Sequence, residues 1–132
     1  MSDPSMNAAQ RPRVLIAEDE ACLAFALADL LEDAGYDVVP FARLDDVARA
    51  AADGADFDLA ILDINLAGEL VYPVVPRLRD RGVPILFASA YGTRSIPAEY
   101  DDVIVLQKPY DPVAMLSTVA SMLTARTVWR AV

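Results

Sequence analysis

Acidic, hydroxyl and basic side chains come within three residues after the ends of four short apolar runs of this 132-residue sequence. They are Glu18, Asp19 and Glu20 after the first run, Asp63 after a central run, and Ser89 and Lys108 after the two runs nearest the C-terminus. Carboxylates that lie close together repel one another, and a divalent cation relieves that repulsion. Mg²⁺ binds a few carboxylates, retains part of its water shell and bridges to phosphate oxygens. If these side chains converge, they provide the groups for transferring a phosphoryl group to a carboxylate.

Each group would have its own part in that chemistry. Asp63 would be the nucleophile, Lys108 and Mg²⁺ would neutralise the phosphoryl oxygens, and Ser89 would donate a hydrogen bond to one of them. Each residue also has an ordinary explanation. Glu18 and Asp19 favour a helix N-terminus, and a lone Asp, Ser or Lys is common in turns or at the surface. The joint occurrence of all the required groups after four separate runs favours the phosphoryl site.

The apolar runs predict the strands that would position these groups. They cover residues 14–17, 38–39, 59–62, 85–88 and 103–106. Most are continuous rather than alternating, as in strands that are covered on both faces. Helical patterns lie between them, and this alternation predicts an α/β fold with a doubly wound, five-stranded parallel sheet flanked by helices. In such folds the functional site lies at the carboxyl ends of the strands, near the switch in strand order.

Three of the helical segments have apolar residues at helical spacing. The predicted buried stripes are Leu23, Leu27, Leu30, Leu31 and Ala34 in one helix, Leu44, Val47, Ala48 and Ala51 in the next, and Val113, Leu116, Ala120 and Leu123 in the last. Gly35 and Gly54 are placed to end the first two helices. Asp111 can cap the last helix, and Pro112 suits its first position.

Two helical segments are less regular. Residues 70–81 contain Pro73 and Pro76, one of which either occupies the first turn of a helix or kinks it. Residues 92–100 contain Pro97 and predict a weak or single-turn helix.

The predicted organisation is a single domain at residues 12–125, with a disordered lead-in at 1–11 and a C-terminal tail at 126–132. The tail contains Trp129 and either extends the last helix or remains free. Cys22 lies among helical apolar residues and is predicted to be a small core side chain. A single cysteine excludes an internal disulfide framework and is typical of a reducing compartment.

Charge and composition exclude several classes of partner. The net charge is −9 and the basic residues are scattered, which disfavours nucleic-acid binding. The sequence contains no histidine, so a phosphoryl donor must be another molecule. No apolar run has the roughly 18 residues of a membrane span, and the first ten residues lack the apolar core of a signal peptide. We therefore expect a cytoplasmic protein without nucleic-acid or membrane partners.

Over residues 13–124 the sequence resembles the CheY-like receiver domains of two-component response regulators, which have a flavodoxin-like sheet. The resemblance is carried by residues 14–20 (VLIAEDE), 62–66 (LDINL), 87–90 (FASA) and 107–110 (QKPY). It implies a phosphorylation site made of the phosphoacceptor Asp63, the direct Mg²⁺ ligand Asp19, its acidic companion Glu18, the Asn65 backbone carbonyl as a further metal ligand, the switch hydroxyl of Ser89 and the phosphate-contacting Lys108. The Lys108–Pro109 peptide is typically cis in the family.

Residues 84–92 (PILFASAYG) are similar to the PFxFATGY signature of the "FAT GUY" single-domain regulators, which partner with HWE-type or related histidine kinases. Ser89 replaces Thr and keeps the hydroxyl, whereas Ala90 replaces Gly and should stiffen the switch loop of Ser89, Ala90 and Tyr91. Many receivers have an aromatic residue on the fifth strand that rotates with the hydroxyl, but residues 103–106 are all aliphatic. Tyr91 then either couples the loop to the surface or shields the acyl phosphate from water.

The resemblance implies a stand-alone response regulator that accepts a phosphoryl group from a histidine kinase onto Asp63, with Mg²⁺ as cofactor. It would catalyse only its own phosphorylation and dephosphorylation and would be a monomer or weak homodimer. Its output would be contact with an unknown downstream protein, or it would serve as a phosphate sink.

Two other functions are weighed against this one. A phosphate-independent protein-binding adaptor is the alternative, although the complete set of groups disfavours it. A flavodoxin-like enzyme would need a phosphate loop rich in Gly, Ser or Thr after the first strand, where this chain is acidic. A haloacid-dehalogenase-type phosphatase would place its nucleophile after the first strand rather than at Asp63.

Overall fold

The computed structural model of the chain describes residues 11–54, 56–91 and 96–131, with side chains described as far as residue 125. Residues 1–10 of the predicted lead-in, Gly92 and the Trp129 side chain therefore lie outside what is described. Among the described residues, no helix combines the length and the apolar character of a membrane span.

Five parallel strands form the central sheet, in the spatial order β2-β1-β3-β6-β7. They are β1 (Arg13–Ala17), β2 (Asp37–Phe41), β3 (Leu59–Asp63), β6 (Ile85–Ser89) and β7 (Ile104–Gln107). The chain steps from β1 to β2 on one side and continues through β3, β6 and β7 on the other, so the strand order reverses between β1 and β3. The predicted doubly wound α/β sheet is confirmed, and its switch point lies where the acidic residues are found.

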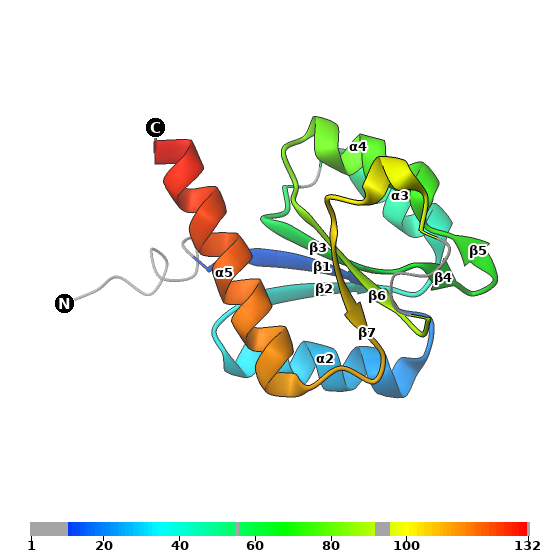
Figure 1. Ribbon diagram of the computed structural model, residues 1–132, viewed down its shortest axis with the longest axis horizontal. Helices are drawn as coiled ribbons and strands as arrows, with labels where there is room; N and C mark the ends of the chain where they lie inside the picture. Colours follow the sequence, from blue (N-terminus) through cyan, green and yellow to red (C-terminus); the bar gives the residue numbers. More distant parts are fainter. Residues whose placement is uncertain (1–10, 55, 92–95, 132) are drawn as a thin grey trace.

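Helices cover both faces of the sheet (Figure 1). Helices α2 (Ala21–Asp33) and α5 (Pro112–Ala131) lie on one face, and α3 (Leu44–Ala52) and α4 (Val75–Asp80) on the other. Two short 3₁₀ turns, η1 (Tyr72–Val74) and η2 (Ala98–Tyr100), accompany the second pair. Each face has its own apolar core, because the buried strands contribute side chains alternately to the two sides.

Several predicted helix boundaries are confirmed. Gly35 follows α2 with a left-handed φ of +99°, as expected for a residue that ends a helix. Asp111 Oδ2 accepts a hydrogen bond from the Ala114 N–H at 3.0 Å, and Pro112 is the first residue of α5. Pro76 lies in the first turn of α4, so it starts that helix and does not kink it. The region before β7 contains the single turn η2, as predicted.

Some predicted core positions are wrong. Leu23 of α2 and Ala34, the residue directly after α2, are exposed, as are Val113 and Ala120 of α5, and Cys22 is exposed rather than buried. Within the part of α5 whose side chains are described, the buried positions are Met115, Val119 and Leu123, of which Leu123 was predicted. Both helices have small and apolar residues on all sides, so spacing alone does not select the face that packs on the sheet. Residues 126–131 extend α5, one of the two possibilities left open for the tail.

The sequence did not predict a small antiparallel hairpin after the third strand of the sheet. It consists of β4 (Asn65–Leu66) and β5 (Glu69–Leu70), and its two-residue turn is formed by Ala67 (φ +53°) and Gly68 (φ +87°). Strands of two residues carry no periodic signal, and alanine is unusual in the left-handed conformation. The predicted helix over residues 70–81 is accordingly shorter, beginning at residue 75 after η1.

We expect Ala67→Asn to raise the free energy of unfolding by roughly 0.5–1 kcal/mol, because asparagine followed by glycine is the preferred pair in a turn with two positive φ values. Urea unfolding followed by circular dichroism measures the change. Ala67→Val is the matched control and should destabilise the protein, since a β-branched side chain is disfavoured at positive φ. Lower stability of Ala67→Asn would contradict the left-handed turn.

Candidate phosphorylation site

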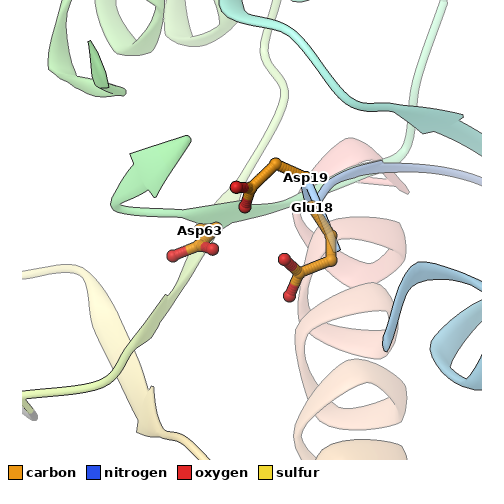
Figure 2. A group of neighbouring side chains, drawn as sticks. All are labelled: Glu18, Asp19 and Asp63. Carbon is orange, nitrogen blue, oxygen red and sulfur yellow. The ribbon is translucent and has the colours of Figure 1, made fainter. Parts of the chain in front are cut away.

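The predicted site residues lie together at the carboxyl ends of the strands. Carboxylate oxygens of Glu18, Asp19 and Asp63 all lie within 4.8 Å of one another, and Figure 2 shows the three side chains gathered beside the ends of β1 and β3. Ser89, at the end of β6, and Lys108, directly after β7, line the same cavity as Asp63. The sequence prediction that these groups converge is therefore confirmed by the geometry.

The register of the parallel strands explains this convergence. Asp63 is paired with Ala88, and Ser89 is paired with Gln107, so the residues that follow each strand meet at one edge. Backbone hydrogen bonds extend the ladder past the strand ends: the Glu18 N–H donates to the Phe41 carbonyl (3.0 Å), and the Lys108 N–H donates to the Ser89 carbonyl (2.7 Å). The Lys108–Pro109 peptide is cis, as the resemblance implied.

Lys108 bridges two of the carboxylates. Its Nζ donates to Glu18 Oε1 at 2.6 Å and to Asp63 Oδ2 at 2.9 Å, and its side chain is only 17% exposed. Burial alone would lower the pKa of Lys108, but the hydrogen bonds and charges of Glu18 and Asp63 outweigh burial and raise it. Lys108 therefore keeps its positive charge at all physiological pH values.

Asp63 is largely buried as well, but the nearby ammonium does not outweigh the effect of burial on its pKa. Burial raises its pKa above the ordinary value of 3.8, and the nearby charge of Glu18 adds to the effect. The Lys108 ammonium and a hydrogen bond from the Asn65 backbone N–H lower the pKa, but by less. One ammonium contacts two carboxylates, so the site keeps a net negative charge, and this charge favours the binding of a further cation.

This net negative charge predicts that Asp63→Asn stabilises the protein when Mg²⁺ is absent. Because the folded state raises the pKa of Asp63, this group favours folding only at acidic pH, and its contribution is lost as the pH rises through the raised pKa. At pH 7 in EDTA we therefore expect the variant to melt several degrees above the wild type. The difference should shrink as the pH approaches 4. Equal melting temperatures at pH 7 would contradict the unfavourable charge.

Ser89 is buried at the end of β6, and its Oγ accepts a hydrogen bond from the Tyr91 N–H at 3.1 Å. Ala90 and Tyr91 are exposed, the Tyr91 side chain to 75%. The Ser89 hydroxyl thus faces the cavity while it also holds the next two residues of the loop. If the Ser89 hydroxyl turned to donate a hydrogen bond to a bound ligand, its bond to the Tyr91 N–H would change, and the loop could change position.

The cavity is larger than the polar cluster. It has a volume of about 810 Å³, and beyond Asp63 and Lys108 it continues along an apolar wall. The wall consists of Leu23, Ala26, Leu27 and Leu30 of α2 together with Pro109, Tyr110 and Pro112. These residues were not predicted to belong to the site. The only available signal was the position of Tyr110 two residues after Lys108, because helical spacing placed the α2 side chains in the core instead.

The donor set fits Mg²⁺. All three side chains of the acidic cluster offer hard carboxylate oxygens, and the exposure of Asp19 leaves room for the waters that Mg²⁺ retains. Lys108 contacts one oxygen each of Glu18 and Asp63, so the second oxygen of each carboxylate is not used by that lysine. No softer ligand from histidine or cysteine belongs to the cluster, which agrees with magnesium rather than zinc.

Comparison with known proteins agrees with this geometry. TcrA, a transcriptional regulatory protein of Mycobacterium tuberculosis, is 38% identical over 84 residues, which cover 61% of this chain and 32% of TcrA. The transcriptional activator IrlR of Burkholderia pseudomallei is 31% identical over 117 residues, covering 84% of this chain and 50% of IrlR. The chain thus spans a third to a half of the length of these relatives.

Solved structures and family membership give the same assignment. The solution structure of SdrG from Sphingomonas melonis superposes with a TM-score of 0.72 at 33% identity, covering 86% of this chain and 97% of SdrG. Residues 14–120 match the response regulator receiver domain, whose members take part in two-component signalling, typically bind Mg²⁺ in an acidic pocket and interact with histidine kinases and effectors. This chain belongs to the response regulator receiver domain family.

Proposed function

We propose that the chain is a phosphorylation switch in which Asp63 accepts a phosphoryl group from a histidine kinase in the presence of Mg²⁺. The observation that carries the proposal is the position of the Lys108 Nζ, 2.9 Å from Asp63 and 2.6 Å from Glu18, with Asp19 in the same cluster. A buried ammonium beside a nucleophilic carboxylate and an acidic metal pocket is the arrangement that phosphoryl transfer needs.

The residues would divide the reaction as follows. An oxygen of Asp63 forms a bond to phosphorus while the bond between phosphorus and the donor nitrogen breaks. Because the phosphohistidine ring carries a proton on its other nitrogen, the donor leaves as a neutral imidazole and Asp63 becomes an acyl phosphate. The Lys108 ammonium moves from the Asp63 oxygen to a phosphoryl oxygen and offsets its charge. The Ser89 hydroxyl donates a hydrogen bond to another phosphoryl oxygen.

The metal pocket would be formed by Glu18, Asp19 and Asp63 together with the Asn65 backbone carbonyl. When bound there, Mg²⁺ supplies positive charge that offsets both the carboxylates and the phosphoryl oxygens. The residues of the chain then keep the Asp63 oxygen oriented toward the donor.

The phosphohistidine must lie outside these 132 residues, because they contain no histidine. The apolar wall formed by α2 and Tyr110 lines the same cavity as Asp63. It would provide a binding surface for a histidine kinase whose phosphohistidine reaches the carboxylate. A kinase of the HWE type or a related type is the candidate that the sequence of the Ser89 loop suggests. The output would be a protein contact that changes when Ser89 releases the Tyr91 N–H.

Incubation with acetyl phosphate tests the proposal. We expect the intact mass to increase by one phosphoryl group when Mg²⁺ is present, and EDTA to prevent the increase. A panel of histidine kinases phosphorylated beforehand then identifies the physiological donor by its rate of transfer. If neither acetyl phosphate nor any kinase labels the protein, the phosphorylation switch is wrong, and a phosphate-independent adaptor becomes the better account.

A further inference from the structure

Strand β7 forms one edge of the sheet, and its outer backbone groups are available for pairing. The Lys108 N–H donates to the Ser89 carbonyl, and backbone groups alternate in direction along a strand, so Leu106 also faces β6. The N–H and C=O groups of Val105 and Gln107 therefore face away from the sheet. Among the residues that the structure describes, none forms a backbone hydrogen bond to these groups from the outer side.

The opposite edge of the sheet, formed by β2, is built differently (Figure 1). The Asp37 N–H and the Phe41 carbonyl both bond toward the β1 side, so Pro40 faces outward by the same alternation. A proline offers no N–H there and disfavours pairing with a further strand. By contrast, β7 contains neither a proline nor a charged residue, and its aliphatic side chains favour a strand. The β2 edge is therefore protected against pairing, and the β7 edge is open to it.

A cavity adjoins the first residues of the β7 edge. It has a volume of about 490 Å³, and its mostly apolar lining includes Ile104 of β7, Met122 of α5 and Pro84. Ile104 is 46% exposed, although it is an aliphatic strand residue. Leu106 packs in the core that α2 and α5 share, so Ile104, two residues earlier, lies on the same face of the sheet. A further strand along β7 would direct every second side chain to this face, where one of them would enter the cavity.

Negative charge marks the same end of β7. Glu99, Asp101 and Asp102 lie directly before the strand, and all three are exposed. Arg79 pairs with both oxygens of Asp102, at 3.2 and 3.3 Å. Within the described part of the chain, Glu99 and Asp101 form no ion pair. A strand that lay along β7 would thus meet unbalanced negative charge at one of its ends, where Lys or Arg would be favoured.

We infer that the β7 edge binds an extended segment of a partner protein, which adds a strand to the sheet. Its main chain pairs with Val105 and Gln107, an apolar side chain enters the cavity beside Ile104, and Lys or Arg lies at the acidic end. Main-chain hydrogen bonds give such a strand its affinity, and the cavity and the charge select its sequence.

Two features separate this surface from other uses. A second copy of the chain is a poorer occupant than a basic segment, because each copy has a net charge of −9 and the copies repel each other. The cavity lies at the amino ends of β6 and β7, whereas Asp63 lies at the carboxyl ends of the strands. Binding at this edge therefore does not depend on phosphorylation of Asp63.

Two short peptides probe the edge of the unphosphorylated protein without Mg²⁺. One begins with Arg-Lys and continues with alternating Val and Thr, and the other has the reverse order. A parallel strand places its first residues beside Glu99 and Asp101, and an antiparallel strand its last, so the two peptides cover both directions. A third peptide carries Glu-Glu in place of Arg-Lys. NMR titration measures the affinity, and amide hydrogen exchange shows which backbone groups are paired.

Variants of β7 test the pairing itself. Val105→Pro removes one outward N–H, as Pro40 does on β2, and Val105→Thr is the matched control that keeps it. Gln107→Pro removes the other outward N–H at an exposed position and replaces Val105→Pro if that variant does not fold.

We expect one basic peptide to slow exchange at Val105 and Gln107 by about tenfold or more, while the outward amide of Val38 on β2 is unchanged. The Glu-Glu peptide should bind about tenfold more weakly, and Val105→Pro, but not Val105→Thr, should weaken the basic peptide by a similar factor.

The absence of protection by both basic peptides at millimolar concentration would overturn the inference. Wild-type affinity of the proline variants would do the same, since the cavity would then bind a ligand without strand pairing. Protection that appears without peptide and rises with protein concentration would assign the edge to a second copy instead.

Discussion

Asp63→Asn is expected to abolish Mg²⁺-dependent labelling by acetyl phosphate. The asparagine side chain has nearly the same shape, and its amide oxygen can still accept the hydrogen bond from the Lys108 Nζ, so the surroundings of the site should be preserved. A neutral amide, however, cannot act as the nucleophile that forms an acyl phosphate. The expected loss is complete within the sensitivity of intact-mass measurement, even though the variant folds and is more stable without Mg²⁺.

Asp102→Asn is the matched control. Asp102 is exposed, pairs with Arg79 at 3.2 Å and lines a separate cavity, so its replacement removes one negative charge without touching the site. This variant should be labelled at the wild-type rate. Labelling of Asp63→Asn at more than a trace would show that another carboxylate accepts the phosphoryl group, the nearest being Glu18 and Asp19 of the same cluster.

Lys108→Ala is expected to slow labelling by about 100-fold or more, since removing one preorganised charge from a reaction centre typically has an effect of this size. The variant also leaves Glu18 and Asp63 without the ammonium that both contact. Their mutual repulsion should raise the pKa of Asp63 further and reduce the fraction of reactive carboxylate. The rate is measured with acetyl phosphate at several Mg²⁺ concentrations, which separates weaker metal binding from slower transfer.

Lys108→Arg gives the second half of this test. Lys108 is the only lysine in the sequence, and all ten other basic residues are arginines. A guanidinium keeps the charge but is planar and larger, so it should not contact Glu18 and Asp63 with the same geometry. We expect a rate between those of the wild type and Lys108→Ala. If Lys108→Ala is as fast as the wild type, the ammonium has only a structural role.

Much of the site could be predicted from the sequence because strand ends are easy to locate. The run before Glu18 and the run before Asp63 are apolar throughout, so each strand ends where the first charged residue appears. In a parallel sheet, those ends must share an edge. The parallel five-stranded sheet and the convergence of Asp63, Ser89 and Lys108 followed from this pattern, whereas the spatial order of the strands was not predicted.

The faces of the helices could not be predicted with the same certainty. In α2, apolar and small residues occur at nearly every position, so the stripe that includes Leu23 fits the spacing as well as the observed contacts of Leu27 and Leu31. Leu27 belongs to the same apolar core as Met115 and Val119 of α5, which lies on the same face of the sheet, and this tertiary packing is not contained in local spacing. The apolar wall of the cavity was missed for the same reason.

The β4–β5 hairpin was missed for a different reason. Its strands are two residues long, and its turn contains alanine where a sequence-based prediction expects asparagine, aspartate or glycine. The compensating hydrogen bond from Gly68 to Asn65 is visible only in three dimensions. The role of the Asn65 backbone carbonyl as a metal ligand stays a prediction, and the hydrogen bond of its side chain to the Gly68 N–H was not predicted.

Mapping the labelled residue tests the central claim most directly. The protein is phosphorylated with acetyl phosphate and Mg²⁺, the acyl phosphate is reduced with borohydride, and the modified position is located by peptide mass spectrometry. The account predicts reduction at Asp63 alone, in an amount that matches the phosphoryl content before reduction. Reduction at Glu18 or Asp19, or phosphoryl content without reduction at Asp63, would contradict it.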